Sequence, residues 1–129
     1  MVSIVEYELM ASNKKIWNYF DQCKEVATSK KDRRTFRLGA VGIRSDGALV
    51  NSANGPTDHP RPHVHAEFRL CTKLDYGAVV FVARVKRDES FGIARPCKDC
   101  RRILKSRNVK KVYYTISNEE YGTYIPIQE

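Results

Sequence analysis

The chain has 129 residues, a formal net charge of +8 and an apolar share of 42%. This length fits a single folded domain, residues 1–129, with a core of its own. No run of about 18 apolar residues occurs, so the sequence predicts no membrane-spanning helix. The first ten residues also lack the basic start and the apolar stretch of a secretory signal.

The net charge and the cysteine spacing indicate the kind of partner and the compartment to expect. A basic surface favours anionic partners such as nucleotides, phosphates or nucleic acid, but the same charge also suits a soluble protein with no polyanion partner. Two of the four cysteines are spaced as C-x-x-C. We therefore expect a cytoplasmic protein with a metal site rather than a disulfide framework.

A helix is the first predicted element, after residues 1–11, which are ambiguous between a strand and a helical turn. Ser12 or Asn13 is a suitable N-cap. Apolar residues then recur at helical spacing on one face, and they are Ile16, Phe20, Cys23 and Ala27. The basic run at residues 29–34 ends this helix, either as a solvated turn or as a polyanion contact.

Two strands and a second helix follow. Residues 35–44 and 48–52 read as strands joined by a hairpin turn at 45–47, and residues 54–62 read as a loop rich in Pro, Gly and Asn. From residue 65 to about 74 the pattern is helical, with one apolar face that also carries Glu67. A lone carboxylate on a core-facing stripe is costly unless it is paired or used, so its position indicates function.

The C-terminal half alternates strands with a helix. Residues 79–85 form an almost continuous apolar run, as expected of a strand covered on both faces. The charged segment 86–95 is either a hairpin or a plain loop. Residues 97–106 read as a helix, 109–116 as a strand and 123–127 as a short final strand, whose tight connection implies antiparallel pairing.

Three residues in two motifs predict a zinc site. His65 stands in H-A-E, and Cys97 and Cys100 stand in P-C-K-D-C, 32 residues later. Three protein ligands leave one zinc position open for water, which is the catalytic arrangement. Glu67 would then carry protons from zinc-activated water to a substrate. This pair of motifs is typical of zinc-dependent nucleoside and nucleobase deaminases.

Each part of this site has an alternative interpretation. The C-x-x-C pair alone would also suit a redox site. Cys71 lies one turn beyond Glu67 and would make a fourth, structural ligand, although it also suits a small buried hydrophobe. His59 and His63 stand outside the H-x-E register and read as loop residues.

Across residues 35–127 the chain resembles the cytidine deaminase-like superfamily, on the two metal motifs, on Leu38-Gly39-Ala40-Val41 and on Asn54 eleven residues before His65. The resemblance implies an α/β fold, a three-layer α/β/α sandwich around a five-stranded mixed sheet. It implies one Zn²⁺ per chain and a homo-oligomer. It also implies that Asn54 and the backbone at Ala66 contact the substrate, although Asn54 alternatively reads as a turn residue at the end of a strand.

The branches of that superfamily leave the substrate open. The terminal strand pair and the segment P-C-x-x-C-R-R-I-L resemble the cytidine deaminases, whereas H-A-E and the C-terminal tail resemble the nucleotide and tRNA deaminases. The compact chain is also similar to small phage-encoded deaminases. Free-nucleoside enzymes usually have a glutamate two residues after the asparagine, and this chain has Pro56 there.

Three functions follow from these observations. The first is deamination of cytosine to uracil in a small nucleotide or nucleoside, with Arg61, Arg95 and Lys98 either meeting a phosphate or adding to general surface basicity. The second is deamination of cytosine or adenine in single-stranded DNA or RNA, with Phe91, Tyr114 and Tyr121 either stacking on bases or anchoring the core. Phe91 is a predicted substrate contact. The third is a catalytically silent zinc-binding module, against which Glu67 argues.

Overall fold

The computed structural model describes residues 13–29, 37–54 and 65–128 of the chain. Expectations for residues 1–12, the basic run beyond Ser29, Pro56, His59, Arg61 and His63 fall outside these ranges. The elements, in chain order, are α2 (Asn13–Ala27), β1 (Arg37–Ile43), β2 (Leu49–Ala53), α3 (Ala66–Leu70), the 3-10 turn η2 (Cys71–Lys73), β3 (Val79–Val85), β4 (Phe91–Gly92), α4 (Lys98–Ser106), β5 (Lys111–Thr115), β6 (Tyr121–Tyr124) and the 3-10 turn η3 (Pro126–Gln128).

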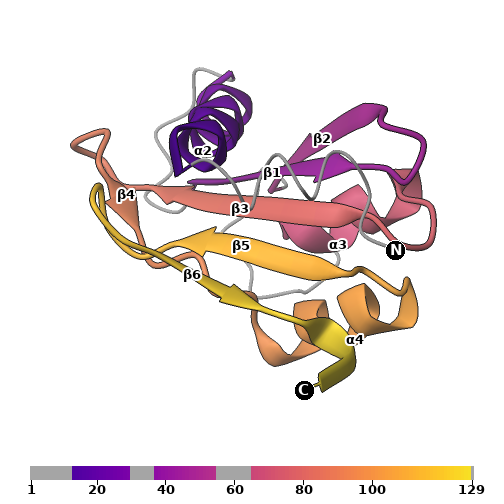
Figure 1. Cartoon of the computed structure of the whole chain (residues 1–129). Helices are drawn as coiled ribbons and strands as arrows, with labels where there is room; N and C mark the ends of the chain where they lie inside the picture. Colours follow the sequence, from indigo (N-terminus) through magenta and orange to yellow (C-terminus); the bar gives the residue numbers. More distant parts are fainter. Residues whose placement is uncertain (1–12, 30–36, 55–64, 129) are drawn as a thin grey trace.

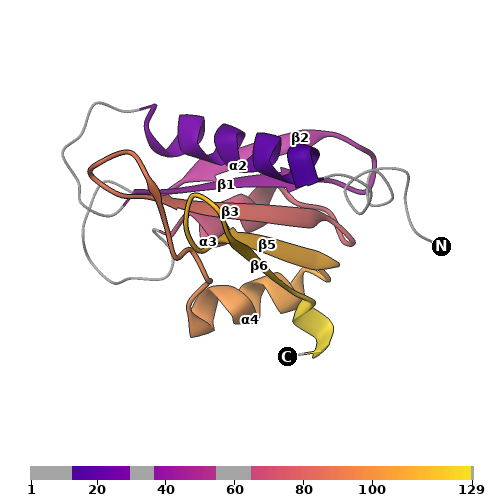
Figure 2. The same cartoon turned by 60° about the vertical axis from the view of Figure 1, so that its left-hand side comes forward.

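The sheet is mixed and lies between two helical layers, which confirms the predicted α/β/α sandwich (Figure 1). Its strand order is β2-β1-β3-β5-β6, with β3 parallel to β5 and the other pairs antiparallel. Figure 2 shows α2 above the sheet and α4 below it. The described sheet has six strands rather than the expected five, because the short β4 also pairs with β3.

The central strand β3 is covered on both faces, as its apolar run predicts. One face of the sheet packs against α2, whose predicted stripe Ile16, Phe20, Cys23 and Ala27 is buried. A Cβ at Gly39 would overlap the carbonyl oxygen of Cys23, so glycine at this position of β1 lets the helix lie directly on the sheet.

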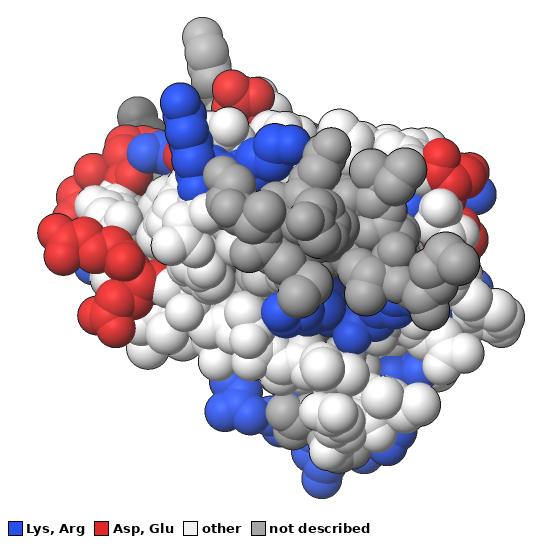
Figure 3. Space-filling model, in the orientation of Figure 1, with Lys and Arg blue, Asp and Glu red and all other residues white. Residues whose placement is uncertain are grey.

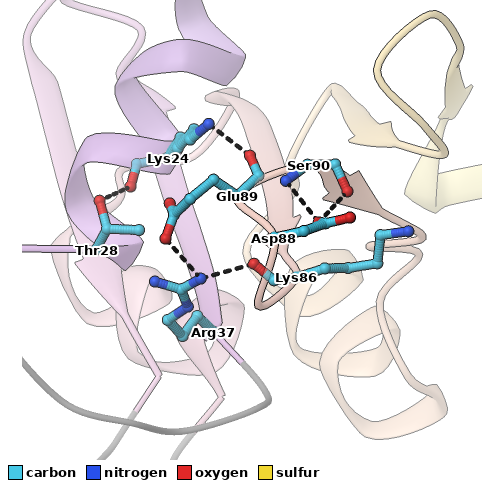
Figure 4. Close-up of polar contacts among 7 residues, drawn as sticks. All are labelled: Lys24, Thr28, Arg37, Lys86, Asp88, Glu89 and Ser90. Carbon is cyan, nitrogen blue, oxygen red and sulfur yellow. Dashed lines mark hydrogen bonds and ion pairs between the residues drawn. The ribbon is translucent and has the colours of Figure 1, made fainter.

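Segment 86–95 forms a hairpin, which decides between the two interpretations of that segment. Arg37 on β1 contacts both sides of the turn: its guanidinium donates to the Lys86 carbonyl at 2.7 Å and pairs with the Glu89 carboxylate at 3.2 Å. The Lys24 ammonium on α2 donates to the Glu89 carbonyl (Figure 4). The charged residues of this segment thus fix the β3–β4 hairpin against its neighbours.

The predicted hairpin turn and the predicted final strand are both present, although the bounds of the strand differ. The predicted turn at 45–47 is present, with the Gly47 amide donating to the Arg44 carbonyl at 2.9 Å and Gly47 at φ +88°. The final strand runs over residues 121–124 rather than 123–127, because Pro126 begins a 3-10 turn and has no amide to continue the ladder. Across the described ranges, no helix combines the length and the apolar character that crossing a bilayer requires.

Candidate active site

The two metal motifs meet where two helices begin. His65 directly precedes α3, and Cys97 directly precedes α4; both have extended backbones, and neither side chain caps its helix. Cys100 lies in the first turn of α4 and is buried. The side chains of His65 and Cys97 make no capping bonds and instead contact each other, so segments 32 residues apart in the sequence come together.

The three predicted ligands form one cluster. The His65 Nδ1 atom lies 3.6 Å from the Cys97 sulfur and 3.5 Å from the Cys100 sulfur, and all three ligand atoms lie within 4.8 Å of one another. Zinc bonds of about 2.3 Å to sulfur and about 2.0 Å to nitrogen, at tetrahedral angles, separate such atoms by about 3.5 Å. The donor set and its spacing therefore fit a zinc ion bound through Nδ1 and two thiolates.

Burial shifts the pKa of two of these ligands, His65 and Cys100. It lowers the pKa of the His65 imidazole, against the opposing charge of Asp99, so the ring nitrogen is available as a ligand. It raises the pKa of the Cys100 thiol well above its usual range, with the nearby Glu67 and Cys97 adding to the effect. Zinc binding therefore requires proton release from the thiols, as is general for thiolate sites.

Glu67 is buried beside this cluster, with 2% of its surface exposed. Burial raises the pKa of its carboxyl to about 7, and hydrogen bonds with its own backbone and with the Cys100 side chain oppose the rise. Its Oε1 atom is enclosed and has no hydrogen-bond partner. A buried acceptor without a partner is costly, so this oxygen has the setting of a group that acts on a bound molecule.

Asn54 and Ala66, which the resemblance predicts to contact the substrate, are both buried. Asn54 directly follows β2, is 4% exposed, and accepts the Leu38 amide on its Oδ1 at 3.0 Å. That bond is the structural role that a strand-end asparagine predicts, and it orients the side-chain amide. Ala66 is fully buried in the first turn of α3, next to His65 and Glu67.

The remaining predicted substrate residues have different surroundings. Arg95 is exposed in the segment between β4 and Cys97. Phe91 is 9% exposed and packs in the α2 layer, with its ring 6.0 Å from that of Trp17. The two tyrosines anchor the core, which was the alternative to base stacking. Tyr121 packs against Phe20, and Tyr114 packs against Tyr124. Phe91 was predicted as a substrate contact that could stack on a base, but as part of β4 it packs in the α2 layer.

Two further points complete the description of the site. In the described part of the chain Cys71 lies outside the metal cluster and is a buried member of the core, where burial raises the pKa of its thiol to about 11. Of the four basic residues on α4, the sequence-based prediction of phosphate contacts included Lys98 but not Arg101, Arg102 or Lys105. Their helical spacing, at 98, 101, 102 and 105, was the signal that would have identified them as one surface.

Comparison with known proteins identifies the family to which this sequence is similar. Residues 13–116 match the family described as the cytidine and deoxycytidylate deaminase zinc-binding region. No curated protein sequence gives a significant match.

Solved structures with a similar fold include three cytidine deaminases. The enzyme from Burkholderia pseudomallei has a TM-score of 0.61 and 16% identity, covering 91% of this chain and 94% of its own. The enzyme from Mycobacterium leprae has a TM-score of 0.60 and 17% identity, covering 91% and 96%. The enzyme from Mycobacterium tuberculosis has a TM-score of 0.54 and 18% identity, covering 77% and 83%. The chain therefore belongs to the cytidine and deoxycytidylate deaminase zinc-binding family, and its cofactor is one zinc ion.

Proposed function

We propose that the protein hydrolyses the exocyclic amine of cytosine in a small nucleotide or nucleoside, giving uracil and ammonia. The observation that carries this proposal is the buried Glu67 carboxylate, with one unpartnered oxygen, next to a cluster of three zinc-type ligands. Three ligands leave a position for water, whereas a purely structural site would be closed by four. A structural zinc site also has no use for Glu67.

In this proposal His65, Cys97 and Cys100 hold the metal. Zinc, when bound, lowers the pKa of a coordinated water so that it acts as a nucleophile near neutral pH. Glu67 accepts the proton that this water loses and delivers protons to the ring nitrogen and to the departing amine, which leaves as ammonia. Its enclosure supports the role, because a carboxyl whose pKa is near 7 both accepts and donates protons at working pH.

The chain's other residues support a nucleotide or nucleoside as the substrate. The solved structures of similar fold are cytidine deaminases by name. Asn54 is fixed by its bond to the Leu38 amide, so its side chain has one orientation in which to meet a substrate. The exposed Arg95, two residues before Cys97, is placed in the sequence to meet a phosphate. A homo-oligomer and a cytoplasmic location stay predictions from the sequence.

Mass spectrometry of incubated substrates tests the proposal. The zinc-loaded protein is mixed separately with cytidine, deoxycytidine, CMP, dCMP and dCTP. We expect a mass gain of about 1 Da on at least one cytosine compound, the exchange of an amino group for an oxo group. The Glu67→Gln variant, with the same zinc content, serves as the control and should give no gain. Absence of a gain on every compound, with zinc bound, would overturn the proposal.

Arg95→Gln separates the nucleotide from the nucleoside. Loss of a phosphate contact raises KM for the nucleotide and leaves KM for the nucleoside unchanged. Equal changes for both substrates would remove Arg95 from phosphate binding and leave the deaminase proposal intact.

A further inference from the structure

The positive charge of the chain is concentrated in one segment. Residues 95–111 contain eight Lys or Arg and one Asp, a net charge of +7 in a chain whose total is +8. Figure 3 shows several groups of blue atoms in its lower part, where Figure 1 places α4, with further blue atoms in the middle and upper parts, while red atoms gather toward the left, right and upper edges. The segment with α4 and its flanks is therefore strongly basic and has almost no acidic residues to offset its charge.

The basic residues of α4 line a groove. Four of them share one side of the helix and border, with Pro126 of η3, a hollow of about 340 Å³; they are Lys98, Arg101, Arg102 and Lys105. Their spacing of three, four and seven residues spans about 10 Å along the helix axis. We call these four residues the α4 basic face.

This arrangement has little compensation inside the described part of the chain. Lys98 with Arg102, and Arg101 with Lys105, are like-charged pairs four residues apart, which destabilise an isolated helix. Lys98 also puts positive charge in the first turn, where the helix dipole disfavours it. Asp99 lies around the helix from this groove, bordering a neighbouring hollow with Arg102. Among the described residues, Lys98, Arg101 and Arg102 form no ion pair with a carboxylate.

We propose that the α4 basic face binds the phosphate backbone of a single-stranded nucleic acid. A row of cations about 10 Å long suits several successive phosphates better than one, and cationic grooves that follow the backbone are typical of single-strand binding. The face begins beside Cys97 and Cys100, so a strand lying along α4 passes the zinc cluster. The inference rests on the proposed function only in that last point, since phosphate binding itself requires no deamination.

Binding of a fluorescein-labelled oligothymidylate of 20 nucleotides tests the inference. Anisotropy is measured on the zinc-loaded full chain between 50 and 200 mM salt. Each phosphate contact on a single strand contributes about −0.7 to the slope of log K against log salt, so four contacts predict an approximately 50-fold loss of affinity over this range. The probe contains no cytosine, so its binding is independent of whether the protein deaminates.

Two triple variants of equal charge locate the contact. Arg101→Gln, Arg102→Gln and Lys105→Gln together should reduce the slope by about 2 and leave an approximately threefold salt effect. The control triple Lys14→Gln, Lys86→Gln and Arg87→Gln removes the same charge from exposed positions on α2 and the β3–β4 hairpin, and it should bind like the wild type. Zinc content and melting temperature verify that both triple variants are folded.

Several results would overturn the inference. These are absence of binding at 50 mM salt, equal weakening by the two triple variants, and competition by free dTMP at the same nucleotide concentration as the strand. Equally tight, α4-dependent binding to phosphatidylserine vesicles would assign the face to a membrane surface instead. Failure of deamination with intact oligonucleotide binding would reject the proposed function and retain this surface.

Discussion

The two faces of the sheet use their buried residues differently. The face toward α2 is a layer of packed rings, in which Phe81 stacks on Tyr113 at 4.7 Å and meets the edge of Phe20 at 5.7 Å. The face toward α3 and α4 is filled mainly by small and aliphatic side chains, such as Ala66, Leu70 and Leu104, with Tyr114 and Tyr124 at one side of the sheet. Beside that second layer lie the metal-type cluster and the buried carboxylate of Glu67.

This contrast indicates that one side of the sheet mainly stabilises the domain and the other side carries its reactive groups. Aromatic packing on the α2 side supplies stability without any reactive group, because rings contribute large buried area and favourable edge contacts. The α3 and α4 side holds a costly group, a buried carboxylate oxygen without a partner. Changes on the two faces should therefore affect different measured properties.

Removing a metal ligand should give the largest effect. We expect Cys100→Ala to retain less than about a tenth of the wild-type zinc content and to lose activity, because metal binding is coupled to folding and needs its thiolates. Elemental analysis measures the zinc. The matched control is Cys23→Ala, which removes a buried thiol from the α2 layer and should keep zinc. Full zinc content in Cys100→Ala would exclude Cys100 as a ligand.

Neutralising the carboxylate should give the next largest effect. Glu67→Gln is expected to lower kcat by about 10³-fold, the range for loss of a positioned proton carrier, while zinc content stays the same. The free energy of unfolding should change little, because glutamine keeps one oxygen that can accept the bonds from the backbone and from Cys100, and Oε1 has no partner to lose. Steady-state rates and denaturant unfolding measure the two quantities. Loss of zinc together with activity would mean that Glu67 is a ligand.

Truncating a ring on the α2 side should lower stability and leave zinc binding unchanged. Phe81→Ala is expected to lower the free energy of unfolding by about 3–5 kcal/mol through the cavity it leaves. At a temperature where the variant is folded, zinc content per chain should equal that of the wild type. Urea unfolding and elemental analysis check this pair of outcomes, and selective loss of zinc would show that the two faces are coupled.

A substitution of Thr115 should give the smallest effect. Like Glu67, Thr115 is a buried polar residue, but its hydroxyl both donates and accepts a hydrogen bond. Its hydroxyl donates to the Gly92 carbonyl at 2.8 Å and accepts the Arg84 amide at 3.3 Å. Thr115→Val should cost about 1–3 kcal/mol of unfolding free energy by stranding these groups, and activity per folded chain should hold. Thr123→Val, on the exposed side of β6, is the control and should change stability by less than about 0.5 kcal/mol.

Local patterns predicted most of the elements because those patterns are short-range. The helical stripe from Ile16 to Ala27, the glycine turn at 45–47 and the apolar run of β3 each appear in the structure where the sequence indicates them. Their information lies in residue spacing, which directly reflects helix and strand periodicity. The short β4 strand was harder to predict, since two residues show no periodicity and pair only through the neighbouring strand.

Residue chemistry and spacing alone were sufficient to predict the zinc ligands, the buried carboxylate and the deaminase family, because a metal with few protein ligands demands particular donors in particular registers. Tertiary structure determined which side chains that are distant in the sequence come together. It directed Phe91 into the α2 layer, gave Asn54 a bond to the Leu38 amide, and aligned the α4 cations along one groove. These outcomes depend on which side of an element faces the core, and strand pairing and helix packing set that orientation.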